Sequence, residues 1–170
     1  TDGNVKIAVD AIKAAQHPHH FLSVTKEGCS AIVSTTGNED CHVILRGGKT
    51  PNYDAMSVNA AATELAASGL APKVMIDCSH ANSSKNPQLQ PLVMADVIGQ
   101  IVAGNKNITG LMIESNLVAG NQPILADRSQ MTYGCSVTDG CVNWDTTEQM
   151  IREAAERLRP VLAQRGINKG

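Results

Sequence analysis

Aromatic side chains are scarce in this 170-residue sequence, which holds one Trp, two Tyr and one Phe. The core must therefore be aliphatic, and the hydrophobic fraction of 42% is typical of a globular chain. No apolar run reaches the roughly 18 residues that a membrane span needs, and no signal-peptide pattern opens the chain. The 170 residues therefore have room for one domain with a real core, and we expect no membrane span.

A strong charge of one sign is absent as well, because the formal net charge is −2 and no long Lys/Arg run occurs. The sequence thus has no electrostatic footprint for nucleic acid or for a membrane surface. It also lacks a CxxC pair, and its five cysteines are odd in number. Reduced thiols in a cytoplasmic protein are the simplest interpretation.

An initiator methionine is missing too, and Thr1 leads through Asp2 and Gly3 into a helical pattern at about 5–15. We expect a chain that begins inside a longer protein, although processing would give the same start. Asp2 is the expected N-cap of this helix, because its side chain can accept a hydrogen bond from the first turn.

Apolar spacing predicts the remaining elements. Two runs with β character, at 21–25 and 31–35, are joined by Lys26-Glu27-Gly28 and predict a hairpin. Apolar strands and helices then alternate, with strands expected at 42–45, 74–76 and 108–113 and helices at about 55–67, 89–102 and 147–162. This order predicts an α/β fold with a parallel sheet covered on both faces. An open doubly wound sheet and half of a (β/α)8 barrel both satisfy it, but no GxGxxG or P-loop pattern supports a nucleotide-binding Rossmann domain.

Three chemically capable side chains follow the expected strands. Arg46, His80 and Glu114 each stand at or just beyond the C-terminal end of a different strand. In a barrel these ends meet at one mouth, where active sites are built. The alternative is chance, since loops are polar in any case.

His80 and Glu114, with Asp139 from the loop after the third strand, form a candidate metal site. One imidazole and two carboxylates suit a divalent ion such as Mn²⁺, Fe²⁺, Co²⁺ or Zn²⁺ without choosing among them. The plainer interpretation is a hydrogen-bonded loop histidine, a helix cap and a turn aspartate.

The segment Arg46-Gly47-Gly48 is a candidate phosphate cradle. A guanidinium offers a bidentate fork, and glycines let backbone N–H groups approach an anion closely. A tight turn with a solvated arginine is the alternative.

Five segments together resemble the class I 3-deoxy-D-arabino-heptulosonate 7-phosphate (DAHP) synthases, metal-dependent TIM-barrel enzymes of the shikimate pathway. The segments are Ile44-Leu45-Arg46-Gly47-Gly48-Lys49, Met75-Ile76-Asp77-Cys78-Ser79-His80-Ala81-Asn82-Ser83, Met112-Ile113-Glu114-Ser115-Asn116, Gly120-Asn121-Gln122 and Ser136-Val137-Thr138-Asp139. They occur in order along essentially the whole chain. The chain thus resembles the C-terminal half of the barrel, with about 21–35 as an inserted hairpin.

The resemblance implies a transferase that condenses phosphoenolpyruvate with erythrose 4-phosphate, the first step of aromatic amino acid biosynthesis. His80, Glu114 and Asp139 match metal ligands of the family. Arg46 matches an arginine that binds the phosphate of phosphoenolpyruvate, and Arg46, His80 and Asp139 are the expected catalytic residues. The metal is expected to polarise the sugar aldehyde, and a homo-oligomer is expected.

This sequence departs from the family at the fourth metal ligand, a cysteine near the end of the first barrel strand. That cysteine and several substrate-binding basic residues have no match here. Cys78, near His80 in the sequence, is not counted as a ligand. We therefore expect half a site, completed by the N-terminal half of the same barrel, and a fragment that is inactive alone.

The hairpin resembles a family element that helps to form the site for feedback inhibition by an aromatic amino acid. Phe21, Ser23 and Val33 match positions that line that site, and Ser23 favours phenylalanine over tyrosine. The alternative is a hairpin that only caps the barrel or an oligomer contact. Two other functions remain open: a 3-deoxy-manno-octulosonate 8-phosphate synthase, which uses the same chemistry on arabinose 5-phosphate, and a non-catalytic half-barrel.

Overall fold

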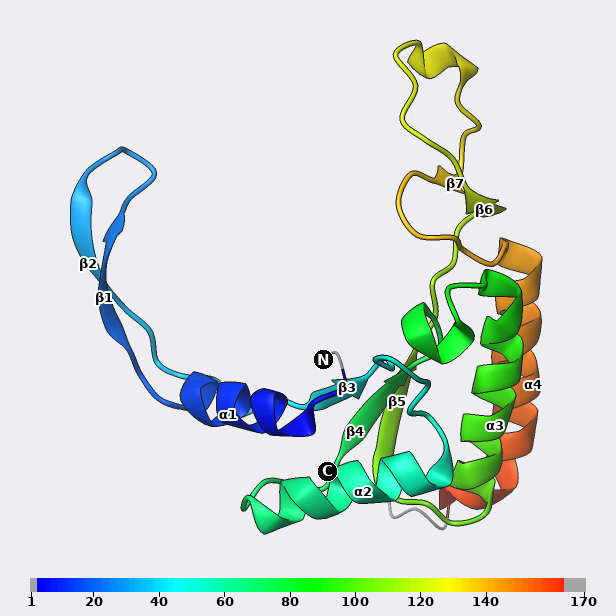
Figure 1. Ribbon diagram of the computed structural model, residues 1–170, viewed down its shortest axis with the longest axis horizontal. Coiled ribbons are helices and arrows are strands. Elements are labelled where there is room, and N and C mark those ends of the chain that lie inside the picture. The colour runs from blue at the N-terminus through cyan, green and yellow to red at the C-terminus, as the bar shows by residue number, and fades with distance from the viewer. Residues whose placement is uncertain (1–2, 164–170) are drawn as a thin grey trace.

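The computed structural model describes residues 3–163, in which helices and strands alternate (Figure 1). The helices are α1 (Val5–Gln16), α2 (Ala55–Ala67), α3 (Gln90–Val102) and α4 (Trp144–Leu162), and the 3-10 helices are η1 (His80–Ser83), η2 (Pro87–Leu89) and η3 (Arg128–Gln130). The strands are β1 (His20–Val24), β2 (Ser30–Ser34), β3 (Val43–Leu45), β4 (Val74–Asp77), β5 (Ile108–Met112), β6 (Val118–Asn121) and β7 (Cys135–Ser136). None of the described helices is long and apolar enough to cross a bilayer.

A parallel three-stranded sheet in the order β3-β4-β5 forms the centre of the chain. Alternate side chains along these strands, among them Leu45, Val74 and Ile76, are at most 1% exposed. They join side chains of α1, α2, α3 and α4 in one aliphatic core. The predicted α/β fold with a parallel sheet is thereby confirmed.

The second face of the sheet is less well covered. Ile44 and Met75 are only half-buried there, and Met112 is 40% exposed. Residues 3–163 alone thus leave this face partly exposed, which is what we expect of three parallel strands without the rest of a barrel.

Side-chain caps determine where three helices begin. Asn4, Asp54 and Asn143 cap α1, α2 and α4, and each accepts a hydrogen bond from the backbone N–H three residues further on. The cap of α1 is thus Asn4 and not Asp2, which itself lies outside the described residues. Because Asn143 is the cap, α4 begins at Trp144, three residues before the predicted start.

The predicted hairpin is present as β1 and β2, each one residue earlier than expected. The strands pair antiparallel, with Phe21 opposite Val33 and Leu22 opposite Ile32. The hairpin extends from the end of α1 away from the sheet (Figure 1). Leu22 is 81% exposed and Ile32 is 72% exposed, so the hairpin is held mainly by its own strand pairing.

The segment between β5 and α4 contains two strands that the sequence analysis treated as loop. β6 pairs with β7 in parallel, and the register shifts between Val118 and Asn121. Both strands are short and the pairing is irregular, so no alternating pattern marks them in the sequence. This segment extends beyond the end of β5 and returns to the start of α4 (Figure 1), and Asp139 lies on its returning part.

Candidate metal centre

The structure brings together the three residues that the sequence singled out as metal ligands. One donor atom each of His80, Glu114 and Asp139 lies within 4.8 Å of the other two. Nε2 of His80 is 3.7 Å from Oε1 of Glu114 and 3.7 Å from Oδ2 of Asp139. Atoms that each lie about 2.1 Å from a shared ion are about 3–3.5 Å apart. The three donors therefore have nearly the spacing of a coordination shell.

His80 is held in an uncommon backbone conformation at the start of η1. Its φ is +51°, in the left-handed region, which costs a residue with a side chain about 1–3 kcal/mol and recurs at functional sites. Nδ1 of the ring is 2.8 Å from Oδ2 of the buried Asp77. Nδ1 makes no hydrogen bond to a described residue. At this distance the imidazole is nevertheless paired with the Asp77 carboxylate, which is placed to orient the ring.

Glu114 lies just beyond β5 and is held at both its backbone and its side chain. Oε2 of its carboxylate accepts a hydrogen bond from Oγ of Ser79 at 2.6 Å. Its backbone N–H donates to Oε1 of Gln90 at 2.9 Å, and its carbonyl accepts from Nε2 of Gln90 at 3.0 Å. The second carboxylate oxygen, Oε1, is the one nearest to His80.

Asp139 is the least enclosed of the three, since its side chain is 67% exposed. The amide of Asn121 donates to the carbonyl of the preceding Thr138 at 2.8 Å. Gly140, which follows, lies close to Pro87, where an added Cβ would be 3.3 Å from Cγ. The loop is therefore positioned on both sides of Asp139, while the carboxylate itself stays largely exposed.

A cavity of about 40 Å³ lies between the three donors and is also lined by Ser79, Lys85 and Gly140. This volume exceeds the roughly 10–15 Å³ that one water needs, so the cavity has room for a small ion. One imidazole and two carboxylates fit Mn²⁺, Fe²⁺, Co²⁺ or Zn²⁺, and the donor set does not select among them. Lys85 was missed by the sequence analysis; like His80 it has a positive φ, of 59°.

Arg46 is exposed, and no hydrogen bond or ion pair joins its side chain to any residue among 3–163. The side chain of Asn82 links the backbone that precedes Arg46 to the backbone that precedes His80. The buried amide of Asn82 donates to the carbonyls of Leu45, at 3.1 Å, and of Asp77, at 2.8 Å. The two strand ends that precede Arg46 and His80 are thereby tied together.

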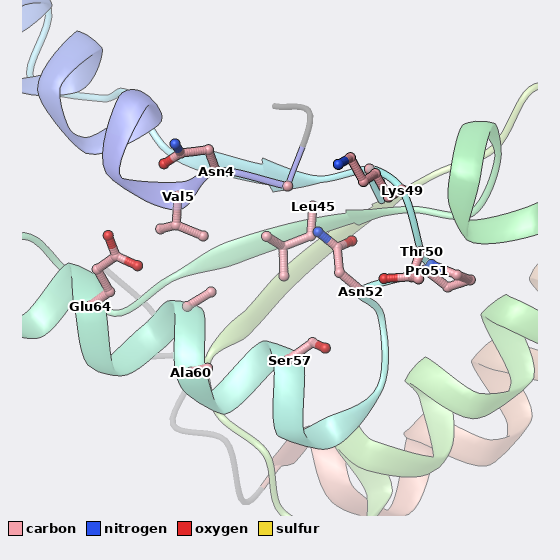
Figure 2. Close-up of a pocket in the computed structure, with 13 residues that line it drawn as sticks. Asn4, Val5, Leu45, Lys49, Thr50, Pro51, Asn52, Ser57, Ala60 and Glu64 are labelled. Atoms are coloured by element: carbon pink, nitrogen blue, oxygen red, sulfur yellow. The ribbon is translucent and has the colours of Figure 1, made fainter.

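A larger cavity lies elsewhere, between α1, β3 and α2, and has a volume of about 710 Å³ (Figure 2). Its lining includes Leu45, Lys49, Asn52 and Ser57 but not Arg46. No group of metal-ligating side chains lies in this cavity among the described residues. The converging donor atoms make the smaller cavity the candidate metal site.

The cysteines near the metal group lie outside the donor group: among the described residues it consists of His80, Glu114 and Asp139. Cys78 is fully buried, and burial, with the charge of Asp77 as a lesser cause, raises its pKa to about 12. Burial is also the main cause that raises the pKa of Cys141.

The three expected inhibitor-site residues share one face of the hairpin. Phe21 lies opposite Val33, and Ser23 lies opposite Ala31. Phe21 is 49% exposed and Val33 is 37% exposed, so these residues line an open strip.

Comparison with known proteins identifies the family. Residues 2–152 match the DAHP synthetase I family. The Phe-sensitive phospho-2-dehydro-3-deoxyheptonate aldolase of Escherichia coli K12 is 52% identical over 166 residues, which cover 98% of this chain and 46% of the relative. The Tyr-sensitive enzyme of the same organism is 46% identical over 165 residues, with 97% and 46% covered. The solved structure of a phospho-2-dehydro-3-deoxyheptonate aldolase from Francisella tularensis SCHU S4 matches with a TM-score of 0.84 at 49% identity, over 92% of this chain and 46% of that one.

The chain thus has an α/β fold with a parallel sheet, and a His–Glu–Asp donor group that could hold a divalent ion lies beyond β4 and β5. The chain belongs to the DAHP synthetase I family. It spans about half the length of these relatives.

Proposed function

We propose that this chain forms the C-terminal half of a DAHP synthase. The enzyme condenses phosphoenolpyruvate with erythrose 4-phosphate and releases DAHP and inorganic phosphate. The observation that carries the proposal is the convergence of His80, Glu114 and Asp139 beyond the parallel strands, in a chain of the DAHP synthetase I family. The names of the two Escherichia coli relatives and of the Francisella tularensis structure support it.

The residues of the site have different tasks in this reaction. His80, Glu114 and Asp139 would hold a divalent ion, which when bound supplies a Lewis acid for the sugar aldehyde. Arg46 is exposed and not engaged in an ion pair, so its guanidinium can take the phosphate of phosphoenolpyruvate. Carbon 3 of phosphoenolpyruvate then bonds to the aldehyde carbon, water adds at carbon 2, and phosphate leaves from that carbon. Holding two anionic substrates together accounts for much of the rate enhancement.

The N-terminal half of the same barrel is part of the proposal. Within residues 3–163, β3 and β5 each have one open edge, and the face with Ile44, Met75 and Met112 is partly exposed. Closing the sheet into a barrel pairs such edges and covers such a face. We therefore propose residues 1–170 as half of a single (β/α)8 domain, with the hairpin as an insertion. The missing half would bring the fourth metal ligand.

A chimera tests this function. The chain replaces the matched 46% of the Phe-sensitive Escherichia coli relative, which contributes the rest of its length. We expect phosphate release from phosphoenolpyruvate only when erythrose 4-phosphate and Mn²⁺ are both present. His80→Ala should abolish turnover, whereas His42→Ala, at an exposed position before β3, should leave it near the parent value.

Three outcomes would overturn parts of the proposal. Preference for arabinose 5-phosphate would indicate the octulosonate-phosphate reaction. A folded chimera that binds Mn²⁺ but condenses neither sugar would contradict the synthase function. Turnover by the 170-residue chain alone would contradict the need for an N-terminal half.

We also propose that Phe21, Ser23 and Val33 contribute to an aromatic amino acid site, with phenylalanine as the favoured effector. Their common face and partial exposure support a contact there, and the Phe-sensitive relative has the higher identity of the two Escherichia coli enzymes. Ser23→Gly in the chimera should weaken inhibition by phenylalanine and leave kcat unchanged. Ser30→Gly, on the other face of the hairpin, is the control, and unchanged inhibition in Ser23→Gly would count against the assignment.

A further inference from the structure

The strongest unexplained polar group near the metal centre is the side chain of Gln90. It is fully buried on α3, and its helical neighbours at positions 93, 94 and 97 are apolar and buried. A buried amide without partners is costly. Both of its polar atoms bond to a single residue, the candidate ligand Glu114, which is 24 positions away.

The carbonyl of Glu114 has a hydrogen-bond donor even without Gln90. That carbonyl also accepts a hydrogen bond from the backbone N–H of Val142 at 3.0 Å. Gln90 therefore adds a second bond to the carbonyl and the bond to the N–H, in a two-point clamp on one peptide segment. Such a clamp limits the φ and ψ of Glu114 and so the direction in which its side chain leaves the backbone.

Ser79 acts at the other end of the same side chain. Its Oγ donates to Oε2 of Glu114 at 2.6 Å, a length typical of a hydroxyl bound to a carboxylate. Because Oε2 is engaged, Oε1 is the oxygen that faces Nε2 of His80. The carboxylate is thereby presented to an ion through one oxygen.

We infer that Gln90 and Ser79 are positioning residues for the metal site: Gln90 sets the backbone of Glu114, and Ser79 sets which carboxylate oxygen reaches the ion. This inference rests on the metal site of the proposed function. Residues that orient metal ligands change metal affinity or activity about 10–100-fold when they are replaced.

The test uses Gln90→Met, which keeps the side-chain length without hydrogen bonds, and Ser79→Ala. The matched controls are Gln88→Met and Ser84→Ala, at exposed positions on nearby turns. The dissociation constant for Mn²⁺ and the visible absorption spectrum with Co²⁺ are measured on the full chain and again on the chimera. Urea unfolding of each metal-free variant shows whether it is folded at the assay temperature.

We expect the Mn²⁺ dissociation constant to rise about 10–100-fold in Gln90→Met, with no change in either control. In Ser79→Ala the Co²⁺ spectrum should shift, because Oε2 becomes available to the ion. If Gln90→Met loses stability but keeps both the Mn²⁺ dissociation constant and the Co²⁺ spectrum, Gln90 contributes only to folding stability. That result would overturn the inference. If Gln90→Met does not fold, Ser79→Ala decides alone, and an unchanged spectrum and affinity there overturn it. If the parent protein binds no Mn²⁺, the metal site itself is wrong, which is a different result from parent binding with unaffected variants.

Discussion

The sheet with its helices and the β1–β2 hairpin use apolar residues in opposite ways. Along the sheet, Leu45, Val74 and Ile76 are at most 1% exposed and belong to one core that includes side chains of α1, α2, α3 and α4. Along the hairpin, Leu22 and Ile32 face each other across the strands and are 81% and 72% exposed. The sheet is thus stabilised by burial, while the hairpin relies on backbone pairing.

This difference bears on the sites proposed for the two regions. A metal site needs ligands held to a fraction of an ångström, which requires packed elements and supporting hydrogen bonds. Glu114 has hydrogen bonds of this kind from Ser79 and Gln90, and the His80 ring lies against the buried carboxylate of Asp77. The hairpin has no comparable packing, so a binding site on it depends on what lies against it.

The largest difference between the two regions should lie in the reactivity of their cysteines. Cys78 is buried behind the sheet and its pKa is raised from 9.0 to about 12 by burial and by Asp77, which lowers its thiolate population about a thousand-fold near neutral pH. Cys29 is exposed at the start of β2. Under native conditions at pH 8, iodoacetamide should modify Cys29 within the time in which Cys78 stays intact, as peptide mass spectrometry would show. Equal rates at the two cysteines would mean that the sheet with its helices opens as readily as the hairpin.

Truncation of one isoleucine in each region should give the next largest difference. Ile76→Ala removes a fully buried side chain from β4 and should cost about 2–5 kcal/mol of unfolding free energy. Ile32→Ala acts on an exposed side chain of β2 and should change stability by at most about 0.5 kcal/mol. Urea unfolding midpoints measure both. A loss in Ile32→Ala as large as that in Ile76→Ala would show that a partner covers the hairpin in solution.

The elements that the sequence predicted correctly are those whose bounds are set by residues nearby in the chain. The bounds of α2 agree with the prediction because Asp54 caps its start and Gly69 follows its end. The three parallel strands were found because they are apolar and short. β6 and β7 were missed, because their pairing joins residues more than ten positions apart with a shifted register, and no short-range pattern encodes that.

The residues of the candidate site also fall into two groups, those that the sequence predicted and those that it did not. His80 and Glu114 could be found because each follows an apolar strand, and strand ends meet in space. Asp77 left a signal that was not used, a carboxylate closing an otherwise apolar strand. Gln90 left another, an amide at a helical position in line with buried apolar neighbours. Their roles could not be read from the sequence, because the partner of Gln90 is 24 residues away and is set by tertiary packing.

Two glycines with similar backbone angles allow strain and packing to be separated. Gly47, in the Arg46 turn, has a φ of 78°, and a Cβ there would lie 2.6 Å from the Cβ of Ala81. Gly28, in the hairpin turn, has a φ of 81° with nothing within 4 Å of the added atom. Alanine at either position should cost about 1–2 kcal/mol for the left-handed conformation. Alanine at position 47 should cost about 1–3 kcal/mol more, from overpacking against η1.

Unfolding midpoints of Gly47→Ala and Gly28→Ala measure this difference directly. Equal losses would mean that the Arg46 turn can move away from η1 at little cost. The coupling of that turn to the metal group, which the bonds of Asn82 indicate, would then be weak.

Metal binding should stabilise the sheet and its helices without involving the hairpin. At one hundred times its dissociation constant, an ion that binds only the folded state adds about 2.7 kcal/mol of stability. Asp139→Asn removes one of the three converging carboxylate or imidazole donors and should lose most of that gain. Glu27→Gln, in the hairpin turn, removes an equal charge far from the cluster in sequence and should keep it. Urea unfolding with and without Mn²⁺, reversed by EDTA, measures the gain. If Asp139→Asn keeps the full gain, the ion binds elsewhere; if Glu27→Gln also loses it, the effect is one of net charge rather than of a site.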